Sequence, residues 1–310
     1  MSFASQVKDE LAKVMSQGRH CQIAELYGIL LFSSSVLVSA RGEYRIKIAS
    51  ENGAMVRKMY ALLKKCFHIK PQVSVREGRK ERMYLLAVTD HAEAFDILQS
   101  VKFIDHNGEL VSDAEPDNSV LLQKECCRKS FLRGAYLASG AMSNPESSNH
   151  LEIVCGFDER ADQVKGILEN IGIKVKISSR KGNKLVYIKE GDAISDFLGS
   201  VGAVRSLMEF ENLRILKEMR NNINRKVNCE TANISKTVSA SVRQLEDIDI
   251  IEENIGLKNL PVSLYEMALI RRQYPDLPLK ELGEKMEPPL GKSGINHRMR
   301  KLSELAEKYR

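Results

Sequence analysis

The strongest constraint on the fold of this chain is an internal repeat with an offset of 106 residues. Gly28 and Gly134 are 106 positions apart, and so are Leu62 and Leu168, which lie in later amphipathic segments. Each copy has the order helix, hairpin, helix, hairpin, helix, with helical spacing in the helices and alternating apolar residues in the hairpins. The repeat predicts a duplicated αββαββα unit, and a length of 310 residues leaves room for a further domain.

The two glycines predict a close contact between helices. The segments "LYGILLFSS" and "LRGAYLASG" place Gly28 and Gly134 in helix interiors. Glycine there costs about 0.5–1 kcal/mol relative to alanine. Close approach of two helix backbones would compensate for that cost, so we expect the two segments to pack against each other at these positions.

These segments resemble the LAGLIDADG motif of homing endonucleases, whose fold is a duplicated αββαββα saddle. The resemblance implies that the metal-binding carboxylates of such nucleases correspond to Ser33 and Ser139 in this chain. A neutral hydroxyl is a poor ligand for a hard divalent cation, and no acid follows closely in either motif. We therefore expect degenerate metal positions, no catalytic residues, no metal and no other cofactor, with an active endonuclease as the disfavoured alternative.

The later hairpin of each copy has a basic turn. Contact with DNA phosphates and the ordinary enrichment of exposed turns in Lys and Arg are equally good explanations. The candidate backbone contacts are Arg79, Lys80 and Arg82 with Arg76 in the first turn, and Arg180, Lys181 and Lys184 in the second.

The last third of the chain has no strand pattern, which predicts an all-α domain. The segment "AVRSLMEFENLRILKEMRNNINR" is expected to be a connecting helix. The Asn-rich stretch "NRKVNCETANISK" after it is expected to cap helices, with phosphate contact by Arg225 and Lys236 as the alternative. The predicted domains are 1–110 and 120–202 for the two repeats, 203–225 for the linker helix, and 226–310 for the DNA-binding domain.

Three helices are predicted after residue 262. Ser263 is expected to cap a helix that ends before Pro275, and a second short helix runs from about Leu279 to Met286. A longer basic helix begins near Ser293. This order is that of a helix-turn-helix domain.

The last helix has one apolar face, formed by Ile295, Met299, Leu302 and Ala306, so the opposite face is available to a ligand. Polar residues at the start of a recognition helix can bond to base edges, and nearby cations can contact phosphates. The predicted DNA-binding residues are Lys292, Ser293, Asn296, His297, Arg298, Arg300 and Lys301.

The sequence "GKS" at Gly291 matches the end of a phosphate-binding loop by chance. The first glycine of that motif would fall at Met286, and Pro288 and Pro289 remove amide donors from the loop. We expect no nucleotide ligand.

Net charge, uncharged stretches and cysteine spacing limit the classes of protein to which this chain can belong. The net charge of +6 permits a polyanionic partner. The longest uncharged stretch, residues 26–40, is shorter than the ~20 residues of a membrane-spanning helix. Asp9 and Glu10 interrupt the region where a secretory signal would be apolar. The six cysteines show neither CxxC spacing nor a histidine partner at metal-ligand spacing, which favours reduced cytosolic thiols: Cys21, Cys66, Cys126, Cys127, Cys155 and Cys229.

The whole chain resembles the WhiA family of bacterial sporulation and cell-division regulators, most distinctively in "NRKVNCETANISKTV" and "PPLGKSGINHR". The resemblance implies a cytoplasmic, nucleoid-associated protein that binds double-stranded DNA and acts in transcription, cell division and chromosome segregation. A further partner among transcription or division proteins is also expected. The remaining alternative is a scaffold of the division machinery that does not use DNA.

Overall fold

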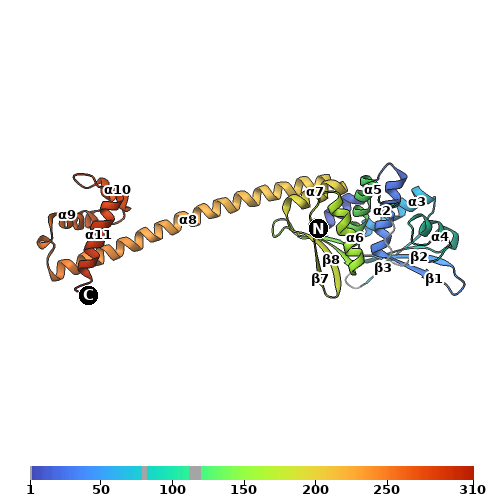
Figure 1. Ribbon diagram of the computed structural model, residues 1–310, viewed down its shortest axis with the longest axis horizontal. Coiled ribbons are helices and arrows are strands. Elements are labelled where there is room, and N and C mark those ends of the chain that lie inside the picture. The colour runs from blue at the N-terminus through green and yellow to red at the C-terminus, as the bar shows by residue number, and fades with distance from the viewer. Residues whose placement is uncertain (1, 79–81, 106, 112–119) are drawn as a thin grey trace. The chain divides into compact units, whose positions relative to one another are not determined.

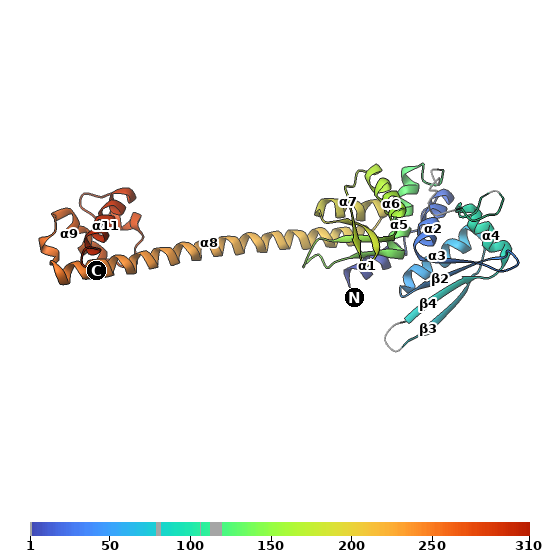
Figure 2. The same ribbon diagram turned by 60° about the horizontal axis from the view of Figure 1, so that its bottom comes forward.

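The computed structural model describes residues 2–78, 82–105, 107–111 and 120–310. The chain forms two compact units, Met1–Lys217 and Glu218–Arg310. The first unit combines helices with two sheets, and the second is helical (Figures 1 and 2).

The first repeat forms a four-stranded antiparallel sheet with strand order β1-β2-β4-β3. Alternation along β2 is clear, because Tyr44, Ile46 and Ile48 are buried while Arg45 and Lys47 between them are exposed. The elements are α2 (Arg19–Ser33), β1 (Ser34–Val38), β2 (Tyr44–Ser50), α3 (Gly53–Phe67), β3 (Gln72–Glu77), β4 (Arg82–Val88) and α4 (His91–Ser100).

The second repeat reproduces this order and topology, with strand order β5-β6-β8-β7. Its elements are α5 (Glu125–Ser139), β5 (Gly140–Met142), β6 (Leu151–Gly156), α6 (Asp158–Asn170), β7 (Lys176–Arg180), β8 (Asn183–Ile188) and α7 (Gly191–Val201). The predicted duplication of αββαββα is therefore confirmed. The bounds of α2 and α5 differ by the same 106 residues as the sequence landmarks.

Helices α2 and α5 pack at the two glycines, as their positions predict. A Cβ atom at Gly28 would lie 2.4 Å from the carbonyl oxygen of Phe131, and one at Gly134 would lie 2.2 Å from that of Glu25. Both obstacles are backbone atoms, so no side-chain movement could make room.

A buried ionic group lies beside this contact. The carboxylate of Glu25 is 3.0 Å from Nζ of Lys58 and 3.1 Å from the guanidinium of Arg133. Arg133 also donates to the carbonyl of Val201 at 2.7 Å and to Ser16 Oγ at 3.1 Å. Burial raises the pKa of Glu25, and the two cations oppose that effect. The carboxylate of Glu25 on α2 therefore forms ion pairs with both α3 and α5.

Helix α1 (Phe3–Leu11) has no counterpart in the sequence prediction. It is capped by Ser2 and buries Phe3, Val7 and Leu11 in the core of the first unit. The carboxylate of Glu10 accepts the backbone N–H groups of Arg205 and Ser206 at 2.8 and 2.9 Å. Glu10 thus caps the first turn of α8, where a negative charge is favourable.

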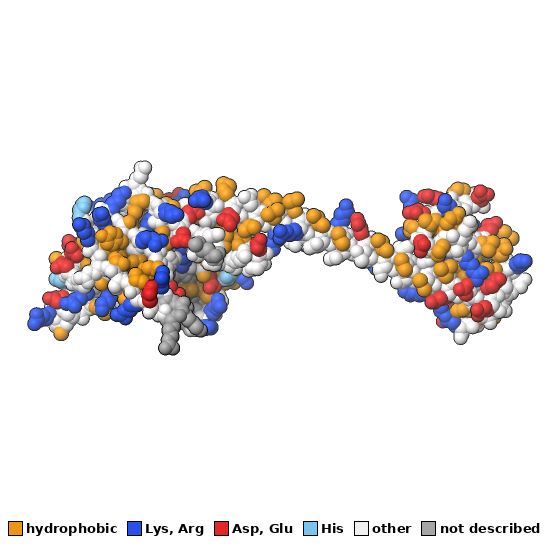
Figure 3. Space-filling model, turned by 180° about the vertical axis from the view of Figure 1, so that it is seen from behind, with side chains coloured by type: hydrophobic (Ala, Val, Ile, Leu, Met, Phe, Trp, Pro, Cys, Tyr) orange, Lys and Arg blue, Asp and Glu red, His pale blue; other side chains and the backbone are white. Residues whose placement is uncertain are grey.

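Helix α8 (Val204–Asn254) corrects the prediction for the connecting region. It is a single helix of 51 residues that continues through the Asn-rich stretch, so these asparagines do not cap helix ends. Its central apolar side chains, including Met219, Ile223, Val227 and Ile234, are more than half exposed. Figure 3 shows hydrophobic side chains, in orange, along the surface of this helix. The expected break between two helices at the Asn-rich stretch is therefore wrong. The domain boundary between residues 225 and 226 stays a prediction.

The second unit has its own apolar core, which includes Ile248, Ile251, Leu282 and Met286. Ser263 lies inside the first turn of α9, which begins at Val262 without a side-chain cap, so its predicted capping role is wrong. The remaining elements are the 3₁₀ turn Leu257–Asn259 and helices α9 (Val262–Gln273), α10 (Leu279–Glu284) and α11 (Lys292–Ala306).

Candidate nucleic-acid interface

Helix α11 is oriented as its periodicity predicts. Ile295, Met299, Leu302 and Ala306 are all buried in the core of the second unit. Six of the predicted contact residues are exposed along the same helix, together with Glu304 farther on: Lys292, Ser293, Asn296, His297, Arg300 and Lys301. These six residues, called the α11 face below, present hydrogen-bond donors and acceptors together with positive charge.

The turn before α11 is fixed by a close backbone contact. A Cβ atom at Gly283 in α10 would lie 2.1 Å from the carbonyl oxygen of Leu290. The amide of Leu290 also donates to the carbonyl of Gly283 at 2.9 Å. Met286, between these two residues, is buried in the core of the second unit. The first turn of α11 that follows is exposed at Lys292 and Ser293.

Two polar groups that sequence reasoning missed hold the domain together. Asp247 of α8 accepts Ser303 Oγ at 2.6 Å and the Arg310 guanidinium at 3.1 Å, which anchors the far end of α11. The buried guanidinium of Arg271 donates to Gln244 Oε1 at 2.8 Å and to the carbonyl of Leu277 at 2.7 Å. The partners of Asp247 are 56 and 63 residues away in the sequence, so the sequence alone does not reveal these pairings.

The predicted contact residues differ in how free their side chains are. Arg298 is half-buried and donates to the carbonyl of Ser263 at 3.2 Å, so it connects α11 to α9. Arg300 pairs with Glu304 at 3.1 Å, and both side chains are well exposed. An exposed pair of this kind is worth little, so DNA could replace Glu304 as the partner of Arg300.

The "GKS" segment does not form a phosphate-binding loop. Gly291 is the N-cap of α11 and Lys292 is its first residue. The second unit, in which every residue is described, has helices before this segment and no strand.

In the first unit, Ser33 and Ser139 are the last residues of α2 and α5. Ser33 Oγ donates to the carbonyl of Ile29 at 2.6 Å, and Ser139 Oγ donates to that of Ala135 at 3.3 Å. Both hydroxyls therefore bond back to their own helix. They do not supply the negative charge that a hard cation requires.

The basic hairpin turns are partly neutralised. Arg82 is 3.1 Å from Glu77, Arg180 is 3.6 Å from Glu152, and Lys184 is 2.7 Å from Asp158. Lys181 is exposed in a turn, while Arg79 and Lys80 lie outside the described residues. Of the α8 candidates, Arg225 and Lys236 are exposed on the helix surface.

The first sheet adds cations that sequence reasoning did not select. Arg45 and Lys47 lie on the exposed face of β2, opposite its buried residues. The strand register places Arg76 of β3 on the same face, because Lys47 pairs with Ala87 and Arg76 pairs with Met83 of β4. Arg45 has a weak exposed pair with Glu43 at 3.8 Å. The alternation of β2 in the sequence was the signal that could have identified this surface.

A group of potential metal ligands also lies in the first unit. His20, Cys21, Cys126 and Cys127 place their ligand atoms within 4.8 Å of one another. The expectation of isolated reduced thiols did not include such a group.

Among the described residues, no helix has the length and apolar composition needed to cross a membrane.

Comparison with known proteins assigns the whole domain order. The model of the WhiA N-terminal LAGLIDADG-like domain matches residues 19–104, and that of the WhiA LAGLIDADG-like domain matches residues 128–220. The model of the WhiA C-terminal HTH domain matches residues 223–306.

Full-length relatives agree with these matches. A probable cell division protein WhiA from Alkaliphilus oremlandii is 43% identical over 99% of this chain and 98% of its own length. A protein with the same name from Clostridium acetobutylicum is 41% identical over 100% of this chain and 99% of its own length. The crystal structure of full-length DUF199/WhiA from Thermatoga maritima aligns with a TM-score of 0.60 and 27% identity, covering 100% of this chain and 99% of that one.

Proposed function

The chain belongs to the WhiA family, and from that premise we propose that it is a non-enzymatic, sequence-selective DNA-binding regulator of cell division. The α11 face carries the proposal, because it presents Ser293, Asn296, His297 and Arg300 on the side opposite the buried residues. Side chains of these types hydrogen-bond to base edges in a major groove.

Two charged residues of the α11 face have a different role. Lys292 and Lys301 are exposed beside the polar residues and contact phosphates in this proposal. Such contacts raise affinity for every sequence and make binding sensitive to salt. Chromosomal DNA as the ligand places the protein at the nucleoid in the cytoplasm. Sporulation and chromosome segregation are further processes that the family resemblance implies.

The saddle has a supporting role in this proposal. Arg45, Lys47 and Arg76 on the exposed sheet face, with Lys181 at a hairpin turn, contact DNA phosphates or the acidic surface of a division or transcription protein. Ser33 and Ser139 lack the charge needed for metal-dependent cleavage. Mg²⁺-dependent nicking of plasmid DNA that is lost on replacement of a nearby acid would contradict the non-enzymatic assignment.

The test compares variants of the full-length chain on a DNA sequence selected from a random pool and on an unrelated sequence. Arg300→Ala and His297→Ala are each expected to reduce the preference for the selected sequence, since a base contact is worth about 1–3 kcal/mol. Lys292→Ala should weaken both sequences alike and lower the slope of log affinity against log salt by about 1.

Lys258→Ala is the matched control, because Lys258 is an exposed cation in the 3₁₀ turn away from α11. It should leave sequence preference unchanged. If the three α11 variants all bind like the unsubstituted chain, the α11 face is not the recognition surface. If the unsubstituted chain shows no salt-dependent affinity for either DNA, the scaffold alternative is favoured instead.

A further inference from the structure

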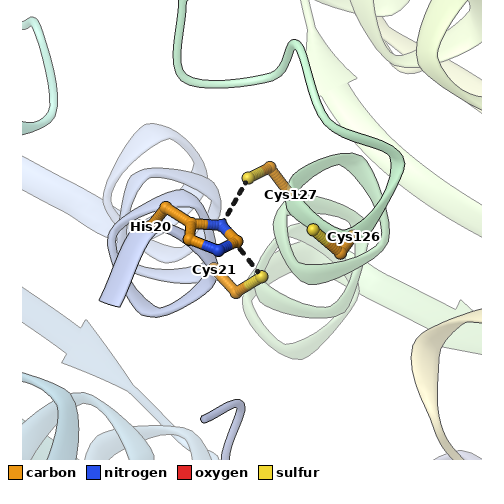
Figure 4. Close-up of side chains that lie close together, drawn as sticks. All are labelled: His20, Cys21, Cys126 and Cys127. Carbon is orange, nitrogen blue, oxygen red and sulfur yellow. Dashed lines mark hydrogen bonds between the residues drawn. The ribbon is translucent and has the colours of Figure 1, made fainter. Parts of the chain in front are cut away.

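The four residues His20, Cys21, Cys126 and Cys127 lie in the first turns of α2 and α5. Nδ1 of His20 is 3.1 Å from Sγ of Cys127 and 3.3 Å from Sγ of Cys21. Figure 4 shows the four side chains around a common centre between the two helices. We call this group the Cys₃His cluster.

The repeat explains why these residues meet. His20 and Cys126 are 106 positions apart, as are Cys21 and Cys127, so the two adjacent pairs occupy equivalent places in the two copies. Helices α2 and α5 pack closely at Gly28 and Gly134, which brings their first turns together. The cluster therefore joins the two repeats at the helix ends opposite Ser33 and Ser139.

We propose that the Cys₃His cluster binds one zinc ion and clamps the two repeats together. Three thiolates and one imidazole form a common tetrahedral ligand set of structural zinc, with Zn–S about 2.3 Å and Zn–N about 2.0–2.1 Å. These bond lengths separate ligand atoms by roughly 3.5–3.8 Å. The observed separations, none above 4.8 Å, require only small side-chain movements to reach that geometry.

The binding step balances in protons and charge. Binding releases three thiol protons to solvent, and neutral His20 contributes the Nδ1 lone pair. The product carries a net charge of −1, which the uncapped N-termini of α2 and α5 stabilise together with Arg19 and Lys124 beside it.

The site is accessible and has room for the imidazole. A pocket of about 340 Å³ is lined by His20, Cys127, Arg19 and Lys124, among others, and gives an ion a route from solvent. Gly18 lies against the ring, since a Cβ atom there would be 2.7 Å from Nε2 of His20. A side chain at position 18 would push the ring from its place.

The experiment measures zinc in the full-length chain after purification with a phosphine reductant, loading with Zn²⁺ and removal of free ion. We expect one zinc per chain by elemental analysis, and loss of that zinc in Cys21→Ser, Cys126→Ser and Cys127→Ser. Co²⁺ in place of Zn²⁺ should give the visible absorption of a tetrahedral thiolate site. His20→Ala should lower the affinity and shift that absorption.

Two choices keep the result interpretable. Cys126→Ser changes an exposed side chain, so loss of zinc in this variant does not reflect unfolding. Cys229→Ser is the matched control, because Cys229 is an exposed thiol on α8 outside the cluster, and this variant should keep its zinc. The proposal is overturned if the unsubstituted chain retains no more zinc than Cys126→Ser, or if Cys21 and Cys127 form a disulfide that zinc does not prevent.

Discussion

At the scale of single residues, Gly28 and Gly134 set the distance between α2 and α5. Gly28→Ala and Gly134→Ala are each expected to destabilise the first unit by about 1–3 kcal/mol, because the new Cβ atom would overlap a carbonyl oxygen of the other helix. Denaturant unfolding monitored by circular dichroism measures this loss.

Gly166 provides the control for these glycines. It lies inside α6, and a Cβ atom there would have no neighbour within 4 Å. Gly166→Ala should therefore stabilise the chain by about 0.5–1 kcal/mol, the ordinary preference of a helix for alanine. Equal effects of all three changes would mean that close packing does not explain the glycines at positions 28 and 134.

At the scale of elements, the middle of α8 tests how asparagine acts when it is not a cap. Asn222 and Asn228 are exposed within the helix, so Asn222→Ala and Asn228→Ala should each stabilise it by about 0.5 kcal/mol. Asn52 is a true cap, since its Oδ1 accepts the amides of Ala54 and Met55. Asn52→Ala should cost about 1 kcal/mol. Helicity and unfolding midpoints distinguish an asparagine inside a helix from an asparagine cap. If Asn228→Ala lowered stability as much as Asn52→Ala, the result would argue for a break in α8.

The elements also explain which parts of the fold could be predicted. The two repeats and the buried face of α11 were predictable because apolar periodicity is a local property of the chain. The continuity of α8 through the Asn-rich stretch was not predictable, because residue type alone does not separate an exposed helix position from a cap. Predicted contacts such as Lys292 follow from the same periodicity, whereas the anchor at Asp247 depends on partners in the folded chain.

The Cys₃His cluster shows a second limit of sequence reasoning. Metal motifs are usually sought as ligands a few residues apart, but the pairs at 20–21 and 126–127 are separated by a whole repeat. The signal that could have found them was the offset of 106, applied to cysteine and histidine as it was to glycine and leucine. Residues equivalent in a duplicated fold are candidates for a shared site wherever equivalent helices pack together.

At the scale of the whole molecule, the two apolar cores share no residue. The first contains Leu137 of α5 and the second contains Leu282 of α10, and both side chains are fully buried. A substitution in one core removes contacts from that core alone. We therefore expect calorimetry of the full-length chain to show two unfolding transitions.

Matched leucine variants test this independence of the cores. Leu282→Ala should cost about 2–5 kcal/mol and lower the transition of the smaller unit by at least about 8 °C, because a small domain has a small unfolding entropy. Leu137→Ala should lower only the other transition, and by fewer degrees for the same free energy, since the first unit is larger. One shared transition that both changes lower together would show that α8 couples the two cores into a single cooperative unit.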